Sequence, residues 1–478
     1  MERILAGVVA VVLCAAACTA SPRTASAPTP ISSARGFAPG APGIGDPYFR
    51  TLGNGGYDVA SYDLNLRYDP STATLSGTAT IKATATQGLS RFDLDLVKLA
   101  ASTVTVDGLG AEHTAQGNEL VVTPARGIAR GQKFTTEITY SGKPAPLDNE
   151  GQSGSGWLST KDGGFAVGEP RSASAWFPVN DHPADKATFR LAMSVPDGIE
   201  AIGNGRPGPR TSAGGWTTWR WDEDAPMASY LALVAIGQFR ITTSVHHGKP
   251  MVIAIPESLP ADGPAAASLS HTGEVADYLA TQFGPYPFDA YGGVIVDDDR
   301  FGSAMETQSR PVYSNEFFRV EEDTGLVAHE LAHQWFGDSV SLNRWEDIWL
   351  NEGFATYAEW LWAQHEGSGS VQSAFDDLYT TIDWKAAPGR PGANGLLDDS
   401  VYDRGGMTLY ALRKTIGDTA FTALLKSWTT EHRGGNATTA DFITAAQRGA
   451  GGRDLGSFFH AWLYGTTKPP ALSAGVRR

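Results

Sequence analysis

Two histidines and one glutamate in the C-terminal half of the chain have the residue types and the spacing of metal ligands. An H-E-x-x-H pattern runs from His329 to His333 inside a segment whose periodicity predicts a helix. Residues four apart share one face of a helix, so both imidazoles point toward one place. Eighteen residues separate His333 from Glu352, which lies at the start of a second predicted helix, residues 351–364. Two imidazoles, a carboxylate and an open position form a catalytic zinc site, which predicts one Zn²⁺ per chain.

Two further glutamates belong to the same stretch. Glu330 projects beside the metal position and is predicted to take a proton from a water whose pKa the metal lowers, then to return it to the leaving group. Glu359 lies two turns after Glu352 on the same helix face, where it would orient a ligating imidazole; a solvent-exposed carboxylate is the alternative. For the motif as a whole, the alternative is an amphipathic core helix with two hydrogen-bonded histidines. A chance match would not also need a third ligand at the right distance.

The periodicity of apolar residues divides the chain into two domains. From residue 57 onward apolar and polar residues alternate, as in Tyr62, Leu64, Leu66 and Tyr68, and turn signals separate the runs. This pattern predicts antiparallel sheets with one buried face, so residues 46–245 are expected to form an all-β domain. The second domain, expected at residues 246–470, is predicted to be an α+β catalytic domain with a buried strand at 294–296. Its predicted helices are 268–283, 323–336, 351–364, 402–416, 419–428, 439–448 and 454–464.

The first 45 residues predict export. A continuous apolar run from Ile4 to Ala17 has the length of a signal-peptide core and is short for a membrane span. Residues 15–18 (Ala-Ala-Ala-Cys) resemble a bacterial lipoprotein cleavage box, so we expect residues 1–18 to be a signal peptide in which Cys18 becomes lipidated. A secretory signal cut near residues 25–27 is the alternative, which would give a secreted protein. Residues 19–45 are rich in Ser, Ala, Thr, Pro and Gly and are predicted to be a disordered linker.

Charge and cysteine content restrict the possible partners. The formal net charge of −15 argues against nucleic acid or an anionic membrane as the main partner, which leaves a lipid anchor at Cys18 as the expected membrane contact. Both cysteines, Cys14 and Cys18, lie in the predicted leader. The predicted domains therefore have no disulfide and no thiol nucleophile or ligand. We expect a monomer.

Four segments together resemble the aminopeptidase N family of gluzincins, over roughly residues 50–465. They are the H-E-x-x-H motif with its distant glutamate, Ser-Ala-Met-Glu-Thr at 303–307, an E-P…F-P-x-x-D-x-P segment at 169–183, and a Y-x-x-G-x-x-x-L segment at 402–409. The resemblance implies a thermolysin-like catalytic domain behind the β domain. It also implies an activity, the removal of residues from the free N-termini of peptides. The chain is short for this family, which leads us to expect a more open cleft.

The resemblance also assigns residues to the substrate. Glu306 would bind the free α-amino group and Glu169 would be the second carboxylate around the same ammonium. Met305 and Thr307 would lie beside the bound peptide. Ser303 and Thr307 replace the usual Gly and Asn of this segment, and Thr307 lacks the amide that would contact the peptide backbone. A glutamate on a surface strand is the alternative for Glu306.

The last assigned residue is Tyr402, whose phenol would stabilise the oxyanion of the tetrahedral intermediate. A buried structural tyrosine is the alternative. Val167 stands where the family often has Gln and is expected to alter the pocket for the first side chain. Two other functions remain open, namely a zinc endopeptidase of broad specificity and a non-catalytic cell-surface binding protein with a retired site.

Overall fold

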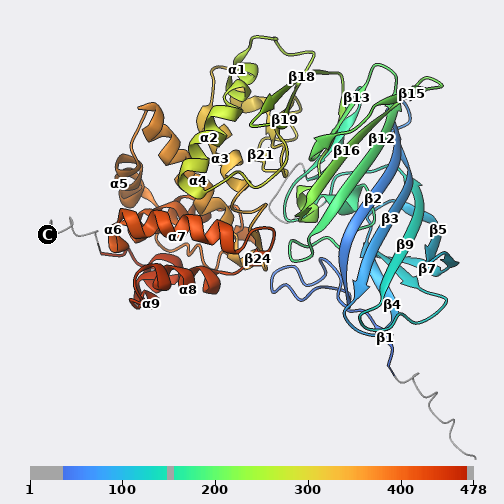
Figure 1. Ribbon diagram of the computed structural model, residues 1–478, viewed down its shortest axis with the longest axis horizontal. Coiled ribbons are helices and arrows are strands. Elements are labelled where there is room, and N and C mark those ends of the chain that lie inside the picture. The colour runs from blue at the N-terminus through green and yellow to red at the C-terminus, as the bar shows by residue number, and fades with distance from the viewer. Residues whose placement is uncertain (1–35, 148–154, 471–478) are drawn as a thin grey trace, which may run out of the picture. The chain divides into compact units, whose positions relative to one another are not determined.

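The structure is a computed structural model that describes residues 36–147 and 155–470. The predicted signal peptide, its Cys18 and residues 19–35 of the predicted linker lie outside this range and stay predictions. In the described part, an N-terminal β domain precedes a domain of helices and a smaller sheet (Figure 1). None of the described helices has the length and apolar character needed to cross a membrane.

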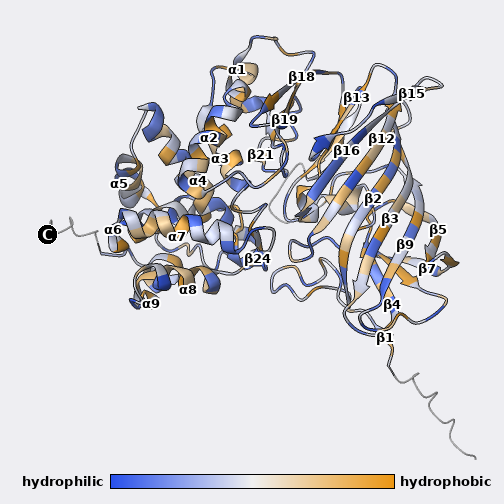
Figure 2. Cartoon of the chain, viewed as in Figure 1, coloured by the Kyte–Doolittle hydropathy of each residue, from blue (hydrophilic) through white to orange (hydrophobic). Residues whose placement is uncertain are grey.

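The β domain shows the predicted two-residue period. In β2, Tyr62, Leu64, Leu66 and Tyr68 are buried and the residues between them are exposed, an alternation also visible along neighbouring strands (Figure 2). The strands are β1 (Ala38–Pro39), β2 (Tyr57–Asp69), β3 (Thr74–Ala85), β4 (Leu89–Asp95), β5 (Ala100–Val106), β6 (Leu109–Gly110), β7 (Glu112–Gln116), β8 (Glu119–Thr123), β9 (Lys133–Gly142), β10 (Gly156–Ser159), β11 (Gly164–Val167), β12 (Ala187–Pro196), β13 (Glu200–Gly203), β14 (Arg206–Pro207), β15 (Thr211–Ala213), β16 (Trp216–Met227) and β17 (Val234–Gly237).

Within the described residues these strands form three sheets. The largest has nine strands in the order β14-β16-β12-β2-β3-β9-β5-β6, with β15 beside β16. Its pairings are antiparallel except that β2 runs parallel to β12. The sheet β1-β4-β8-β7 lies at one end, and the sheet β10-β11-β17-β13 faces the second domain. Strand β11 matters for function because Glu169 follows its last residue by two positions.

The folded part of the chain begins earlier than predicted. Ala38–Pro39 forms β1 and pairs with β4, and Gly40 donates its N–H to the carbonyl of Arg91 at 2.8 Å. The prediction of a linker to residue 45 is therefore wrong for residues 38–40. Composition misled it, because this segment is held by main-chain hydrogen bonds to a sheet edge and not by apolar burial.

The boundary between the domains also lies earlier than residue 245. Strand β18 (Phe239–His246) pairs along its whole length with β19 (Lys249–Pro256). Both strands belong to the sheet of the second domain, whose order is β18-β19-β20-β22-β21. An alternating hairpin looks the same in either domain, so its pattern could not place the boundary. The predicted buried strand at 294–296 is confirmed as part of β20 (Tyr291–Val296). The other strands here are β21 (Ala304–Met305), β22 (Val312–Ser314), β23 (Ser341–Leu342) and β24 (Asn436–Ala437).

The predicted helices are present with shifted ends. The one predicted at 268–283 begins at Pro264 and is interrupted at His271, and the segments 400–404 and 460–464 are π-helical. Helix α5 was not predicted, because its face buries only two apolar side chains among the described residues, Val371 and Phe375. The helices are α1 (Pro264–Ser270), α2 (Thr272–Phe283), α3 (Thr324–His333), α4 (Trp349–Glu366), α5 (Val371–Thr381), α6 (Gly405–Ile416), α7 (Asp418–Glu431), α8 (Thr439–Gly449) and α9 (Gly456–Phe459).

Buried cations join the two domains. Arg310, which follows β21, is fully buried and donates to the carbonyls of Gly203 and Gly205 at the end of β13. From the other side, the Lys186 ammonium donates to the carbonyls of Asp338 and Ser339 at 2.7 and 3.0 Å. Both contacts end on main-chain atoms next to the segments that carry the predicted site, so they fix one domain against the other there.

Helices α4 and α6 meet at two glycines. A Cβ on Gly353 would lie 2.7 Å from the Cα of Gly405, and a Cβ on Gly405 would lie 2.7 Å from the Cα of Gly353. The two backbones touch, so neither position has room for a side chain. Because Gly353 follows Glu352 directly, this contact sets the position of the predicted third ligand.

We predict that Gly353→Ala separates α4 from α6 and lowers the free energy of unfolding by about 1–3 kcal/mol, the usual cost of overpacking. Urea denaturation followed by tryptophan fluorescence measures it. The matched control is Gly449→Ala in α8, where the new Cβ would meet Leu424 at an ordinary 3.6 Å. The control should change stability little, and equal stability of the two variants would contradict the proposed contact.

Candidate metal centre and active site

Helix α3 places three predicted site residues in the interior. The carboxylate of Asp323 caps its first turn by accepting the N–H of Leu326 at 2.8 Å. From that start, the helical register buries His329, Glu330 and His333, with 9%, 5% and 2% of each residue exposed.

Glu352 on α4 meets both imidazoles. Its Oε2 lies 3.5 Å from His329 Nε2 and 3.4 Å from His333 Nε2, and one ligand atom from each residue falls within 4.8 Å of the others. The Nδ1 atoms are held from behind, that of His329 by Glu359 at 3.3 Å and that of His333 by the carbonyl of Phe336 at 3.1 Å. Both rings therefore present Nε2 to the same place. The predicted ligands come together, and Glu359 contacts the His329 ring although its side chain is 41% exposed.

The electrostatics of these three residues favour positive charge between them. Burial acts to raise the pKa of Glu352, but the imidazoles of His333 and His329 outweigh it and hold the pKa at about 2. Burial acts to lower the pKa of His333, but Glu352 and Glu306 outweigh it and raise the pKa to about 9. The same place would hold a divalent cation, and two imidazoles with one carboxylate are the donor set that fits zinc.

Glu330 lies beside this place, and one of its oxygens falls within 4.8 Å of ligand atoms of Glu306 and His333. Its Oε2 is buried and has no hydrogen-bond partner among the described residues. Burial raises its pKa to about 8, since the lowering effect of His329 and His333 is partly cancelled by Glu306 and Glu352. A buried carboxyl with a free oxygen and a pKa near neutrality can accept and return a proton.

Glu306 is positioned from both domains. It follows β21, its carbonyl accepts from Gln334 Nε2 on the turn after α3 at 3.0 Å, and its Oε1 accepts from the phenol of Tyr230 at 3.1 Å. Tyr230 belongs to the β domain and is itself within 3.5 Å of Asn351 Nδ2 on α4. Burial raises the pKa of Glu306, with Glu352 adding to the effect.

Glu169 brings a second carboxylate from the β domain. It is 4% exposed, and an oxygen of each of Glu169, Glu306 and Glu352 lies within 4.8 Å of the other two. Burial and the neighbouring Glu306 raise the pKa of Glu169 well above its usual range. The pairing of Glu169 with Glu306 that the sequence suggested is therefore present in space.

Tyr402 lies in the π-helical segment before α6, and its ring stacks on that of His329 with centroids 6.0 Å apart. Burial and the surrounding carboxylates raise the pKa of its phenol well above 10, so the group is a neutral donor at physiological pH. It lies on the same cavity as the other site residues.

These residues line a cavity of about 170 Å³. Four carboxyl groups and two imidazoles face it, and no lysine or arginine is among the described residues that line it. Met305 lines the cavity as predicted. The prediction for Thr307 is wrong as far as its side chain is concerned, because its buried hydroxyl donates to the carbonyl of Arg310 at 2.6 Å. The lining residues are Glu169, Ser303, Ala304, Met305, Glu306, Phe317, Leu326, His329, Glu330, His333, Glu352, Leu397 and Tyr402.

Sequence reasoning missed Tyr230 and Gln334, the two residues that orient Glu306. Gln334 directly follows His333, and its amide contacts both the Glu306 carbonyl and, through Oε1, the N–H of Ser309 at 2.6 Å. Its place beside the motif was the available signal. Tyr230 had none, because it is one tyrosine in a β domain far from the motif.

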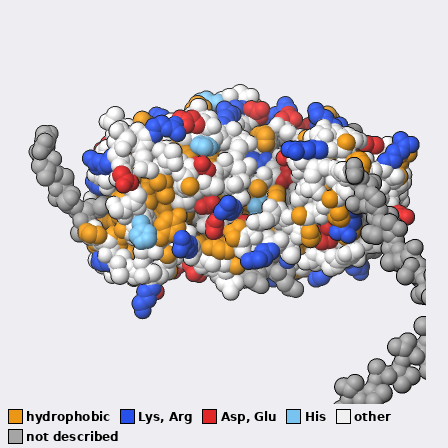
Figure 3. Space-filling view, turned by 90° about the horizontal axis from the view of Figure 1, so that it is seen from below, with side chains coloured by type: hydrophobic (Ala, Val, Ile, Leu, Met, Phe, Trp, Pro, Cys, Tyr) orange, Lys and Arg blue, Asp and Glu red, His pale blue; other side chains and the backbone are white. Residues whose placement is uncertain are grey.

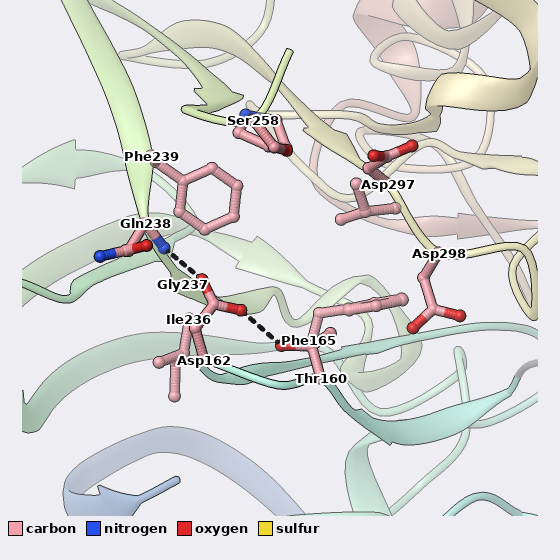
Figure 4. A pocket seen from close by; sticks show the side chains of 12 residues that line it. Thr160, Asp162, Phe165, Ile236, Gly237, Gln238, Phe239, Ser258, Asp297 and Asp298 are labelled. Atoms are coloured by element: carbon pink, nitrogen blue, oxygen red, sulfur yellow. Dashed lines mark hydrogen bonds between the residues drawn. The ribbon is translucent and has the colours of Figure 1, made fainter.

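A second cavity, of about 140 Å³, lies between β11, β17 and the end of β20 (Figure 4). Its carboxylates already have partners. Asp162 accepts the N–H of Gln238 at 2.9 Å and the hydroxyl of Thr160 at 3.1 Å, and Asp298 accepts from Arg300 Nε at 2.8 Å. No imidazole is among its described lining residues, so carboxyl groups and imidazoles occur together only at the first of these two cavities.

Outside the cavities, acidic and basic side chains are interspersed on the face shown in Figure 3. The negative net charge is not gathered into one patch on that face.

The fold and the site together define a zinc metallopeptidase of the H-E-x-x-H type. Residues 59–231 match the peptidase M1 N-terminal domain, and residues 267–462 match the peptidase family M1 domain. The chain belongs to peptidase family M1. The cofactor of this family is zinc.

Solved and curated relatives agree on the family. An M1 zinc metallopeptidase from Deinococcus radiodurans is 30% identical, with a TM-score of 0.83 over 91% of this chain and 100% of that one. A glutamate-to-alanine variant of the Deinococcus protein, bound to a Tyr-Ser-Ala substrate, is 29% identical, with a TM-score of 0.82 over 90% and 99% of the two chains. Aminopeptidase N of Streptomyces lividans is 25% identical over 85% of this chain and 50% of its own length. The chain spans half or less of the first curated relatives it matches.

We predict that Glu359→Gln weakens zinc binding by about 10–100-fold, because the amide holds His329 Nδ1 less firmly than a carboxylate does. Competition with a chelator of known affinity measures it. Glu366→Gln is the matched control, since Glu366 lies on the same helix and contacts only the hydroxyl of Thr324 among the described residues. A zinc affinity for Glu359→Gln equal to that of the control would show that Glu359 does not orient the ring.

Proposed function

We propose that the chain is a zinc aminopeptidase that hydrolyses the first peptide bond of peptides with a free N-terminus. One observation carries the proposal: four carboxyl groups share one buried cavity, and no lysine or arginine is among the described residues that line it. Buried charges need partners. A divalent metal ion and a substrate ammonium together bring three positive charges, which leaves one carboxyl for proton transfer.

His329, His333 and Glu352 would hold the zinc ion. When bound, zinc would polarise the scissile carbonyl and lower the pKa of a water molecule. Glu359 and the carbonyl of Phe336 keep both Nε2 atoms turned toward the ion.

Glu330 is the proposed general base. Its free, buried Oε2 takes a proton from the attacking water and returns it to the amine that leaves. The raised pKa suits both steps, since a carboxylate of ordinary acidity would give the proton back poorly. In the same step the neutral phenol of Tyr402 donates to the developing oxyanion.

Glu306 and Glu169 are the proposed anchors of the substrate ammonium. Both are buried and both have raised pKa values, so each gains from a cation placed between them. A substrate with a blocked N-terminus would leave two buried acids without that partner, which selects for free N-termini. The phenol of Tyr230 fixes the direction of one of these acids.

The relatives support this reading. The Streptomyces protein bears the name aminopeptidase N, and the Deinococcus structure holds a short peptide described as its substrate.

We predict that Glu330→Gln lowers kcat by about 10²–10⁴-fold, the usual contribution of a general base, while KM changes little. Hydrolysis of an aminoacyl p-nitroanilide measures it.

Zinc content is the control, because the amide leaves the three ligands untouched and the variant should keep one zinc ion per chain. A variant that keeps both its zinc and most of its activity would exclude this role for Glu330. Wild-type protein that carries zinc and hydrolyses no peptide would favour the retired binding protein.

We predict that a free dipeptide amide is cleaved with a kcat/KM about 100-fold above that of its N-acetylated form. The acetylated substrate places no ammonium between the two acids, and losing a buried charged partner costs about 2–5 kcal/mol. Glu306→Gln should reduce this preference by lowering the rate for the free amine only.

Tyr230→Phe serves as a graded variant, since it removes the phenol from Glu306 and leaves the acid in place. It should reduce the preference less than Glu306→Gln does. Equal rates for the two substrates with wild-type protein would refute the anchor and favour the zinc endopeptidase.

A further inference from the structure

A second group of metal-ligating side chains lies away from the cavity, where the β18–β19 hairpin meets helix α2. His246 is the last residue of β18, and the hairpin turn consists of His247 and Gly248. Both turn residues have positive φ, +47° and +76°, as in a type I′ turn. This turn brings two adjacent histidines to the same side of the hairpin.

Both imidazoles converge on one carboxylate. His246 Nε2 lies 2.9 Å and His247 Nε2 lies 2.8 Å from the same oxygen, Oδ1 of Asp277 on α2. One ligand atom from each of the three falls within 4.8 Å of the others. The two Nε2 atoms and the Oδ1 atom all carry lone pairs, which repel one another at these distances. A positive group must therefore lie between them, either two N–H protons or one cation.

Neighbouring residues of the fold fix the position of the His246 ring. The ring of His246 lies over Gly273, one helical turn before Asp277, where a Cβ would come within 3.1 Å of its Cε1 and Nδ1. On another side, Tyr291 meets the ring edge to face at 5.2 Å and 84°. Only a residue without a side chain lets the ring approach α2 this closely, so the Nε2 atom is directed at Asp277.

We propose that His246, His247 and Asp277 bind a divalent transition-metal ion at a site separate from the catalytic zinc site. Two imidazoles and a carboxylate suit zinc, nickel, cobalt and copper, with water in the remaining positions. The ion ties the β18–β19 hairpin, which begins the second domain, to helix α2. The side chains of His247 and Asp277 are 64% and 48% exposed, so the ion exchanges with solution without passing through the cavity.

The test is zinc stoichiometry by equilibrium dialysis of the full chain at micromolar free zinc, followed by elemental analysis. Wild-type protein should bind two zinc ions per chain. His247→Ala and Asp277→Asn should each bind one, with at least tenfold weaker affinity for the other, and should keep full peptidase activity. His329→Ala should also bind one ion, but should lose activity.

His271→Ala is the matched control. His271 is an exposed histidine at the start of the same helix and pairs with Glu274 at 2.9 Å, but no second imidazole joins it among the described residues. This variant should keep both ions. One ion in wild-type protein that His247→Ala retains, or equal losses in His247→Ala and His271→Ala, would overturn the proposal. Loss of the catalytic ion alone would count against the proposed function and leave this site standing.

Discussion

Four carboxyl groups crowded into one buried cavity are the constraint on which this structure depends. Desolvation of even one carboxylate costs several kcal/mol, and here no lysine or arginine compensates among the described residues that line the cavity. The carboxyl groups respond differently. Glu352 stays ionised because two imidazoles flank it, whereas Glu330 tends toward the neutral form. The arrangement favours cations from outside the chain, so it is better suited to binding than to holding the fold together.

The scaffold around the cavity relies on close contacts to the main chain. Gly353 and Gly405 let two helices touch at the third ligand, and the buried Arg310 ends on main-chain carbonyls of the other domain. Gln334, next to the second histidine, ties the motif helix to the segment that carries Glu306. Gly353, Gly405, Arg310 and Gln334 are not among the described residues that line the cavity. Their role is to keep atoms on separate elements within a narrow range of positions.

How much of the fold and the site could be predicted from the sequence depends on whether the informative residues lie close together in the chain. His329 and His333 were predictable because helical periodicity brings them to one face of one helix, and Glu352 because it lies at a third ligand's distance from that motif. Glu169 was found through family resemblance, since its partner Glu306 is more than 130 residues away in the chain. Tyr230 was not predictable, because its contact depends on domain packing. The domain boundary and the start of the fold were misplaced for a similar reason, since alternation and composition do not show which sheet a strand joins.

The two proposed anchors for the substrate amine belong to different domains, whereas the proposed metal ligands and the proposed base lie on α3 and α4 alone. A displacement of one domain by about an ångström would spoil the pairing of Glu169 with Glu306 and leave the hydrolytic machinery assembled. Selectivity for free N-termini therefore depends on how the two domains are placed, whereas bond cleavage does not. Weakening the contacts between the domains would therefore leave peptide hydrolysis intact but remove the selectivity for free N-termini.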